Sequence, residues 1–235
     1  MCALSVRGNA KRVANEKDWS QVVQELQKEN LKLMSYDHAL LAELGNVCGR
    51  SVLDYGAGPG VLALTLTKLG AIVKVFDVSA EMRQKAAHNI GRRNVYDSVV
   101  KIPQGEFDIV VCNLVVCIVS ESEVRRIARN ISKLLRAGGQ AYVGFCNPKI
   151  HNVAESRLDF RYFSGKPYGQ NHNYWKVKKE GFYQIVERHR PISWYAKAFA
   201  QSGLKVGKLI FTPKYRLRGR QIQDFVIFSL QKNTP

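Results

Sequence analysis

The chain has 235 residues, 46% of them hydrophobic, and carries a formal net charge of +17. This length suits one domain, or one domain with a lid, and is sufficient to bury a full hydrophobic core. The sequence contains no run of 18 apolar residues and no apolar signal-peptide core, which excludes a membrane-spanning helix and indicates a cytoplasmic protein.

The five cysteines show no pattern typical of metal binding. None forms a Cys-x-x-Cys pair, and no group of cysteines and histidines has the spacing of a zinc site. We therefore expect reduced thiols and no metal. The cysteines are Cys2, Cys48, Cys112, Cys117 and Cys146.

The first 50 residues are expected to form a helical cap. Residues 13–30 place apolar side chains on one helical face and charges on the other, which predicts a helix. A second helix is expected over 34–45, ending at Gly45. This cap leads into the first strand, at 51–55.

Strands alternate with helices from residue 51 to residue 148. This alternation predicts a parallel sheet with helices on both faces. Ser79 is expected to cap a helix that stops at Gly91. The expected strands are 51–55, 71–77, 94–97, 107–113 and 140–146, and the expected helices are 59–69, 80–90 and 121–136.

The pattern changes after Pro148. Residues 149–190 are polar, aromatic and basic with little periodicity, so we expect an insertion over the site that contacts the substrate. Residues 191–235 regain order, with a helix followed by two strands at 204–211 and 224–230. A basic loop joins these strands, and the pair is expected to form a hairpin at the sheet edge.

The positive charge is unevenly distributed along the chain. Residues 149–235 hold 17 Lys/Arg and 5 Asp/Glu, whereas residues 1–148 hold 19 and 14. This excess indicates an acidic partner, which leaves open a nucleic acid, an anionic small molecule or a membrane surface. Charge that serves only solubility is the alternative.

A glycine-rich turn over residues 52–60 is the most informative feature. A buried strand runs into three alternating glycines, Gly56, Gly58 and Gly60, which let a ligand approach bare backbone. Asp77 follows the second strand, where a carboxylate can accept hydrogen bonds from a ribose diol. The glycine spacing does not fit the dinucleotide fingerprint, in which the third glycine stands one residue later.

The stretch from Asp54 to Gly60 resembles the first motif of the class I S-adenosylmethionine-dependent methyltransferases, acidic-x-Gly-x-Gly-x-Gly. The resemblance extends from about Val52 to Pro148 and includes Asp77, FDIVVCNLV at 107–115 and LLRAGGQAYVGF at 134–145. It implies an α/β, Rossmann-like fold with a seven-stranded, mostly parallel sheet, helices on both faces and a C-terminal edge hairpin. The whole chain is then a single methyltransferase domain.

The same resemblance implies that S-adenosylmethionine is the cofactor and assigns residues to it. Asp77 is expected at the ribose, Asp97 and Ser98 at the adenine edge, and Asn113 at the methyl end. The residues expected to bind the cofactor are Asp54, Gly56, Ala57, Gly58, Gly60, Asp77, Val78, Asp97, Ser98, Asn113 and Leu114.

Candidates for catalysis lie near the expected mouth of the site. His189 precedes a helix in a stretch similar to one near the active site of small-molecule methyltransferases, so it is a candidate base, with Asn113 beside the methyl group. Arg190 is a candidate for pairing with an acidic acceptor. His151 and Tyr174 are further candidates for contacting the acceptor.

Three functions remain open from the sequence. The first is methyl transfer to oxygen or nitrogen of a small, aromatic or anionic acceptor. The second is RNA methylation through the basic C-terminal third, and the third is a non-catalytic, cofactor-binding partner subunit. Cys146-Asn147-Pro148 resembles the nucleophile motif of RNA 5-methyluridine methyltransferases, but that family's Asp-Pro-Pro-Arg loop is missing, so a structural thiol is the default. The sequence does not indicate the oligomeric state.

Overall fold

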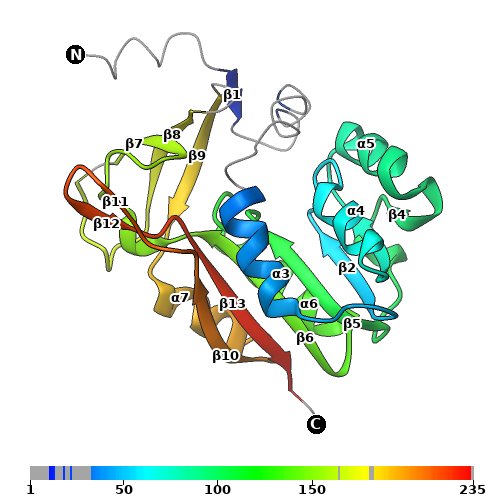
Figure 1. The fold of residues 1–235 in the computed structure, drawn as a ribbon. Coiled ribbons are helices and arrows are strands. Elements are labelled where there is room, and N and C mark those ends of the chain that lie inside the picture. The colour runs from blue at the N-terminus through cyan, green and yellow to red at the C-terminus, as the bar shows by residue number, and fades with distance from the viewer. Residues whose placement is uncertain are drawn as a thin grey trace.

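The computed structural model describes residues 11–13, 18, 22, 33–163, 165–179 and 183–233. These residues form one large and one small β-sheet, a short hairpin and the helices that cover the large sheet (Figure 1). No helix in the described part of the chain is long and apolar enough to cross a membrane. The helix expected over 13–30 falls mostly outside these residues.

The large sheet has seven strands in the order β10-β13-β6-β5-β2-β3-β4. Neighbouring strands from β6 to β4 run parallel, and β13 pairs antiparallel with both β6 and β10. The predicted α/β fold with an antiparallel edge is therefore confirmed. The strands are β2 (Ser51–Tyr55), β3 (Ile72–Phe76), β4 (Val95–Tyr96), β5 (Phe107–Asn113), β6 (Leu135–Cys146), β10 (Leu204–Phe211) and β13 (Phe225–Lys232).

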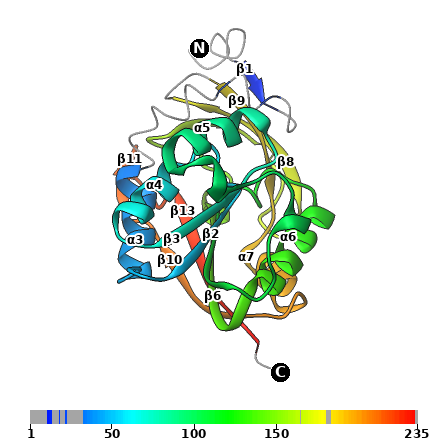
Figure 2. The ribbon, with the colours of Figure 1, turned by 90° about the vertical axis from the view of Figure 1, so that its right-hand side faces the viewer.

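Helices cover both faces of the large sheet, as the alternating pattern predicts (Figure 2). On one face, α3, α4 and α5 pack on apolar side chains such as Val52 and Val111, and on the other α6 and α7 pack on Val110 and Phe145. Ser79 caps α5 by accepting from the Met82 amide, as predicted. The helices are α3 (His38–Leu44), α4 (Val61–Lys68), α5 (Ala80–Ile90), α6 (Glu121–Leu134) and α7 (Ile192–Ala200), with a π-helical turn η2 (Leu33–Asp37) and 3-10 turns η3 (Arg92–Asn94), η4 (Val99–Lys101) and η5 (Pro148–Ile150).

The insertion after Pro148 is a small antiparallel sheet rather than an irregular segment. β7 (Asp159–Tyr162), β8 (His172–Lys178) and β9 (Tyr183–His189) pair in that order, and β1 (Lys11–Val13) adds parallel to β9. Alternate residues of β9 are buried, but two of the four buried ones are Glu187 and His189. These polar residues on the inner face interrupt the alternation of apolar and polar residues that indicates a strand, so β9 was not predicted from the sequence.

The basic loop between β10 and β13 also contains structure that the sequence did not predict. β11 (Tyr215–Leu217) and β12 (Arg220–Ile222) form a two-stranded hairpin at its tip. Arg218 and Gly219 both have positive φ, at 49° and 78°. This conformation is the one favoured in tight hairpin turns, which explains why two such short strands pair.

Candidate functional site

The glycine-rich turn between β2 and α4 is folded back on the end of β3. The Gly56 amide donates to the Phe76 carbonyl at 2.7 Å. Gly56, Gly58 and Gly60 have φ values of 80°, 56° and 77°, which L side chains rarely adopt. A Cβ on Gly56 would also overlap the Val115 side chain. The turn therefore requires glycine both for its conformation and for its close approach to the loop after β5.

The carboxylate of Asp77 is fixed by this turn. Its Oδ2 accepts from the Gly58 amide at 2.8 Å and its Oδ1 from the Ser79 amide at 2.9 Å. Burial raises the pKa of Asp77, although both amides and Arg83 favour its charged form. Each carboxylate oxygen has a further lone pair, so Asp77 can still accept hydrogen bonds from ligand hydroxyls.

Asn113, at the end of β5, is held by a residue of the N-terminal segment. The Tyr36 hydroxyl donates to Asn113 Oδ1, and the Tyr36 ring is fully buried. This ring lies against Gly144 of β6, where any Cβ would overlap the hydroxyl. The glycine on β6 thus makes room for the tyrosine that orients Asn113.

The loop that follows Asn113 begins with a strained residue. Leu114 has a φ of 60°, a backbone conformation that glycine and asparagine adopt readily but leucine rarely does. Its amide donates to the Gly144 carbonyl at 2.7 Å, which ties the loop to β6. Strain of this kind persists only where surrounding contacts enforce it, and it is common at binding sites.

A cavity of about 230 Å³ extends from the glycine turn to the inner face of the small sheet. One wall comes from the carboxyl ends of β2, β3 and β5, as expected for an open parallel sheet. The opposite wall comes from β8 and β9. The core wall includes Asp37, Asp54, Gly56, Ala57, Gly58, Asp77, Val78, Asn113, Leu114 and Cys146, and the small-sheet wall is formed by Lys176, Lys178, Tyr183 and Ile185.

The small sheet carries buried charges on the side that faces the large sheet. We name Asp159, Arg161, Lys176, Glu187 and Asp224 the charged cluster. Arg161 lies 3.0 Å from Asp159 and 3.8 Å from Asp224, and Lys176 pairs with Glu187. All five residues are at most 5% exposed. Desolvation on this scale is tolerated because each charge has an opposite neighbour.

Ion pairing shifts the pKa values of Asp159, Arg161 and Lys176 toward their charged forms. Burial alone would raise the pKa of Asp159, but Arg161, Lys176 and Lys178 hold it below its ordinary value. Burial alone would lower the pKa of Lys176, but Cys146, Glu187 and Asp159 raise it. Asp159 and Lys176 therefore stay ionised at neutral pH, whereas burial raises the pKa of Asp224.

Cys146 ends β6 where the charged cluster meets the cavity. Its sulfur lies 2.9 Å from Lys176 Nζ. A hydrogen bond from the Cys117 thiol lowers the pKa of Cys146, and the positive charge of Lys176 lowers it further, although burial alone would raise it. The same hydrogen bond raises the pKa of Cys117. The two thiols thus differ, with Cys117 the donor and Cys146 the acceptor.

Most residues assigned to the cofactor from the sequence line this cavity, and three do not. Gly60 begins α4, where a Cβ would press on Ala86. Asp97 is exposed and pairs with Lys101 at 2.9 Å, and Ser98 begins a 3-10 turn. The residues assigned from sequence that the cavity brings together are Asp54, Gly56, Ala57, Gly58, Asp77, Val78, Asn113 and Leu114.

The residues expected to contact the acceptor lie behind the cavity wall. His189 is 4% exposed, its Nε2 lies 2.8 Å from the Tyr168 carbonyl oxygen, and its ring lies 4.6 Å from that of His151 and 4.7 Å from that of His172. Tyr174 lines a separate small hollow beside it. His189 lines the same hollow.

Arg190 braces the loop after β5. Its guanidinium donates to the carbonyls of Val116 at 3.1 Å and Val119 at 2.6 Å, and to the Tyr195 hydroxyl at 3.2 Å. The buried guanidinium thus positions the cavity wall through hydrogen bonds to the chain itself.

Sequence patterns did not identify the small-sheet wall of the cavity. Lys176 and Lys178 are two residues apart on β8, so they lie on the same face, and both are buried. A Lys-Val-Lys alternation beside aromatic residues was the available signal. This alternation did not indicate a buried wall, because buried lysines are rare and a basic run normally indicates solvent exposure.

Comparison with known proteins agrees with this geometry. A family model described as a methyltransferase domain matches residues 53–143. Ribosomal protein L11 methyltransferase of Vibrio cholerae is 30% identical over 117 residues, which is 48% of this chain and 40% of that protein. The enzyme of the same name from Methylobacillus flagellatus is 37% identical over 95 residues, covering 38% and 30%. The chain thus spans well under half the length of these relatives.

Solved structures share the fold at low identity. An S-adenosylmethionine-dependent methyltransferase from Mesorhizobium loti superposes with a TM-score of 0.62 at 20% identity, covering 83% of this chain and 96% of that one. The 1,6-didemethyltoxoflavin-N1-methyltransferase of Burkholderia thailandensis, solved with S-adenosylhomocysteine, gives 0.61 at 14% identity, covering 92% and 86%. Residues 53–143 thus match a methyltransferase domain, and the sheet order agrees with the class I, Rossmann-like methyltransferase fold.

Proposed function

We propose that the chain binds S-adenosylmethionine and transfers a methyl group to oxygen or nitrogen of a small anionic acceptor. The observation that carries this proposal is the separation of charge along one cavity. Asp54 and Asp77 lie on the core wall, whereas Lys176 and Lys178 lie on the small-sheet wall. A cationic cofactor fits the acidic end and an anionic acceptor the basic end.

The residues of the acidic end fit this cofactor. The turn at Gly56 offers bare backbone, and the two amides that fix Asp77 leave its remaining lone pairs for the ribose. Asp54 is 2% exposed and lines the cavity, so its charge acts in a largely water-free space. When bound, the cofactor supplies an electrophilic methyl group on a positively charged sulfur.

The chain itself has to orient the acceptor and exclude water. Asn113 lies at the carboxyl end of β5, and the Tyr36 hydrogen bond limits its rotation. The small sheet closes the other side of the cavity with Tyr183 and Ile185. Holding the acceptor in line with the methyl group supplies most of the catalysis that such a displacement needs. Residues 149–190 accordingly form the acceptor-binding part of the domain.

Transfer of a radiolabelled methyl group to paired acceptors tests this proposal. We expect aromatic carboxylates to be labelled faster than their neutral amides. Lys178→Gln should lower kcat/KM for the carboxylates by about tenfold or more, because a charge-assisted hydrogen bond is lost, and should affect the amides less. Lys101→Gln removes an exposed lysine outside the cavity and serves as the control. Equal labelling of carboxylates and amides would contradict the anionic acceptor.

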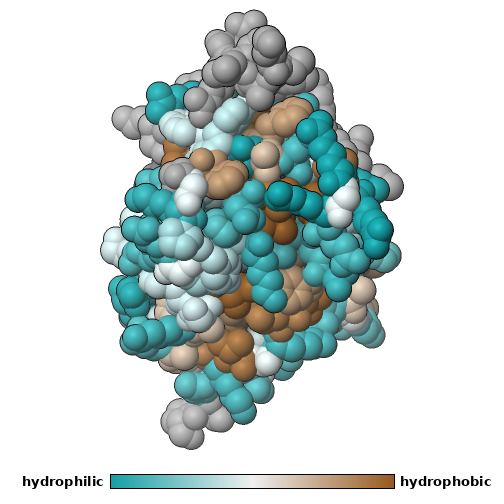
Figure 3. Space-filling model, turned by 90° about the vertical axis from the view of Figure 1, so that its left-hand side faces the viewer, coloured by the Kyte–Doolittle hydropathy of each residue, from teal (hydrophilic) through white to brown (hydrophobic). Residues whose placement is uncertain are grey.

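A second candidate, an RNA acceptor, is favoured by the β11–β12 hairpin. Lys214, Arg216, Arg218 and Arg220 are all exposed there. The side of the molecule that carries this hairpin is largely hydrophilic, with apolar patches scattered between the hydrophilic side chains (Figure 3). Fluorescent tRNA titrated at several salt concentrations separates the candidates. Tight binding with a steep salt dependence would favour RNA, and no binding below high micromolar would favour the small acceptor.

A further inference from the structure

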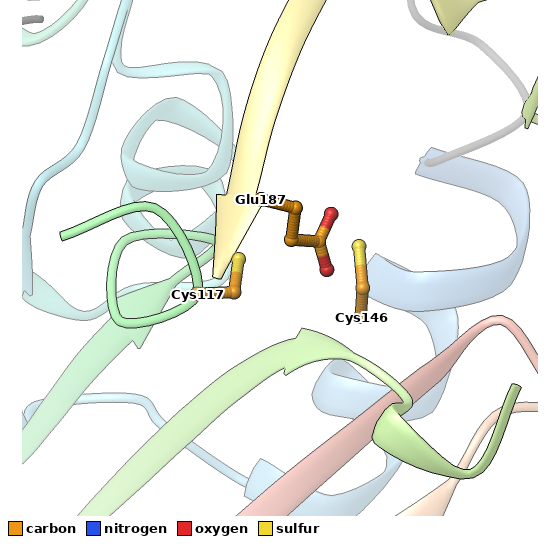
Figure 4. Close-up of side chains that lie close together, drawn as sticks. All are labelled: Cys117, Cys146 and Glu187. Carbon is orange, nitrogen blue, oxygen red and sulfur yellow. The ribbon is translucent and has the colours of Figure 1, made fainter. Parts of the chain in front are cut away.

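Two thiols and a carboxylate meet beside the cavity although they come from distant parts of the chain. Cys117 lies in the loop after β5, Cys146 ends β6 and Glu187 lies on β9 of the small sheet. Their sulfur and carboxylate oxygen atoms lie within 4.8 Å of one another, and Figure 4 shows the three side chains converging on a common point. Each residue is at most 7% exposed.

This donor set suits a soft divalent cation. Thiolates select d10 ions such as Zn²⁺ and Cd²⁺, and a carboxylate oxygen is a common third ligand for zinc. Three protein ligands are the usual number where a fourth position stays open. Cys117 and Cys146 both line the cavity, so an open position has a space to face.

The surrounding charge also fits a divalent ion. Two thiolates and the Glu187 carboxylate carry three negative charges in a buried place. Lys176 Nζ lies 2.9 Å from Cys146 Sγ and pairs with Glu187, which supplies one positive charge. A divalent cation supplies the other two, so the bound site is neutral, which is the condition for burying charge at low cost.

We propose that Cys117, Cys146 and Glu187 form a binding site for a soft divalent cation, with Lys176 as the counter-charge beside it. The site shares Lys176 with the basic end of the cavity, but it needs neither cofactor nor acceptor, so its test is separate from that of methyl transfer. It departs from the expectation of no metal, which rested on spacing along the chain. The three ligands come from separate elements of the fold, so no spacing motif in the sequence indicates them.

Cadmium titration of the reduced, metal-stripped protein tests the site. Cys2→Ser and Cys48→Ser are introduced first, because Cys48 is an exposed thiol that would bind cadmium on its own. We expect one equivalent of Cd²⁺ with a thiolate-to-metal ultraviolet band. Cys117→Ser and Cys146→Ser should each weaken binding by more than about 100-fold, since even outer partners of a metal site are worth about 10- to 100-fold.

Cys112→Ala is the matched control, because Cys112 is also a buried thiol but is not one of the converging ligands. It should leave the stoichiometry and affinity unchanged. Binding that survives both Cys117→Ser and Cys146→Ser, or no binding to the parent protein, would overturn the proposal.

If Cys117→Ser or Cys146→Ser fails to fold, X-ray absorption at the cadmium edge tests the site instead. It is measured on the protein that carries only Cys2→Ser and Cys48→Ser. The proposal predicts two sulfur ligands with oxygen or nitrogen completing the shell. Any other number of sulfur ligands would overturn it.

Discussion

The two walls of the cavity are built on opposite principles. The core wall rests on apolar side chains of β2, β5 and β6, and its polar residues Asp54 and Asn113 stand near the ends of strands. The small-sheet wall rests on the charged cluster and buried histidines. The stability of the core wall therefore does not depend on ionised side chains beneath it. The stability of the small-sheet wall does, because each buried charge there needs an oppositely charged partner.

Breaking the charged cluster should give the largest effect on stability. Arg161→Met leaves Asp159 and Asp224 without their guanidinium partner in a place that water does not reach. Removing one member of a buried ion pair costs about 3–5 kcal/mol in the free energy of unfolding. Urea denaturation of the variant and parent measures this difference.

The control for that experiment is an ion pair on the surface. Asp97 and Lys101 are 2.9 Å apart but more than half exposed. Asp97→Asn should change the free energy of unfolding by less than about 1 kcal/mol. Similar losses from Arg161→Met and Asp97→Asn would mean that burial of the cluster does not matter, against the contrast between the walls.

Acid should destabilise the small sheet through its histidines. Burial lowers the pKa of His189 to about 4, opposed by the hydrogen bond to Tyr168, while His151 and His172 lower it further and Glu187 raises it. The unfolded chain takes up this proton near pH 6.5 and the folded chain only near pH 4. Stability is thus full above pH 6.5 and falls as the pH drops toward 4, by about 3 kcal/mol at most.

Denaturation curves across this pH range check the histidine prediction. His189→Gln should flatten the fall between pH 6.5 and 4, because the proton-binding group is gone. His88→Gln removes an exposed histidine and should leave the profile as in the parent. An unchanged profile for His189→Gln would show that the acid sensitivity has another source.

The contrast between the two walls also explains how much of each could be predicted from the sequence. The core strand 107–113 was predicted with its bounds, because its residues other than Asp108 are apolar and its end is polar. Asp54, Asp77 and Asn113 follow from motif order and lie together. Lys176 and Lys178 could not be predicted, because their burial depends on partners such as Asp159 and Glu187 elsewhere in the chain. The helix expected at 13–30 stays a prediction.

His189 and Arg190 illustrate a second limit. Both stand where the sequence places the mouth of the site, and the fold brings both close to it. His189 lies on the same face of β9 as Tyr183 and Ile185, which line the cavity, but it stands farther along the strand, where it is paired with His172. This position depends on the pairing of β8 with β9, which the sequence pattern did not predict.

A smaller effect than that of Arg161→Met is predicted on the core side. Tyr36→Phe keeps the ring but removes the hydrogen bond to Asn113. We expect a loss of about 1 kcal/mol in the free energy of unfolding, typical of one hydrogen bond. A loss as large as that of Arg161→Met would show that the core wall also depends on polar support.

Calorimetric titration of the chain with S-adenosylhomocysteine tests the cofactor site most directly. We expect one bound equivalent, an affinity lowered about tenfold or more by Asp77→Asn, and no change with Asp97→Asn. Asp77 lines the cavity beside the glycine turn, whereas Asp97 is an exposed carboxylate outside it. Absence of binding, or binding that depends on Asp97 and not on Asp77, would contradict the placement of the cofactor in this cavity.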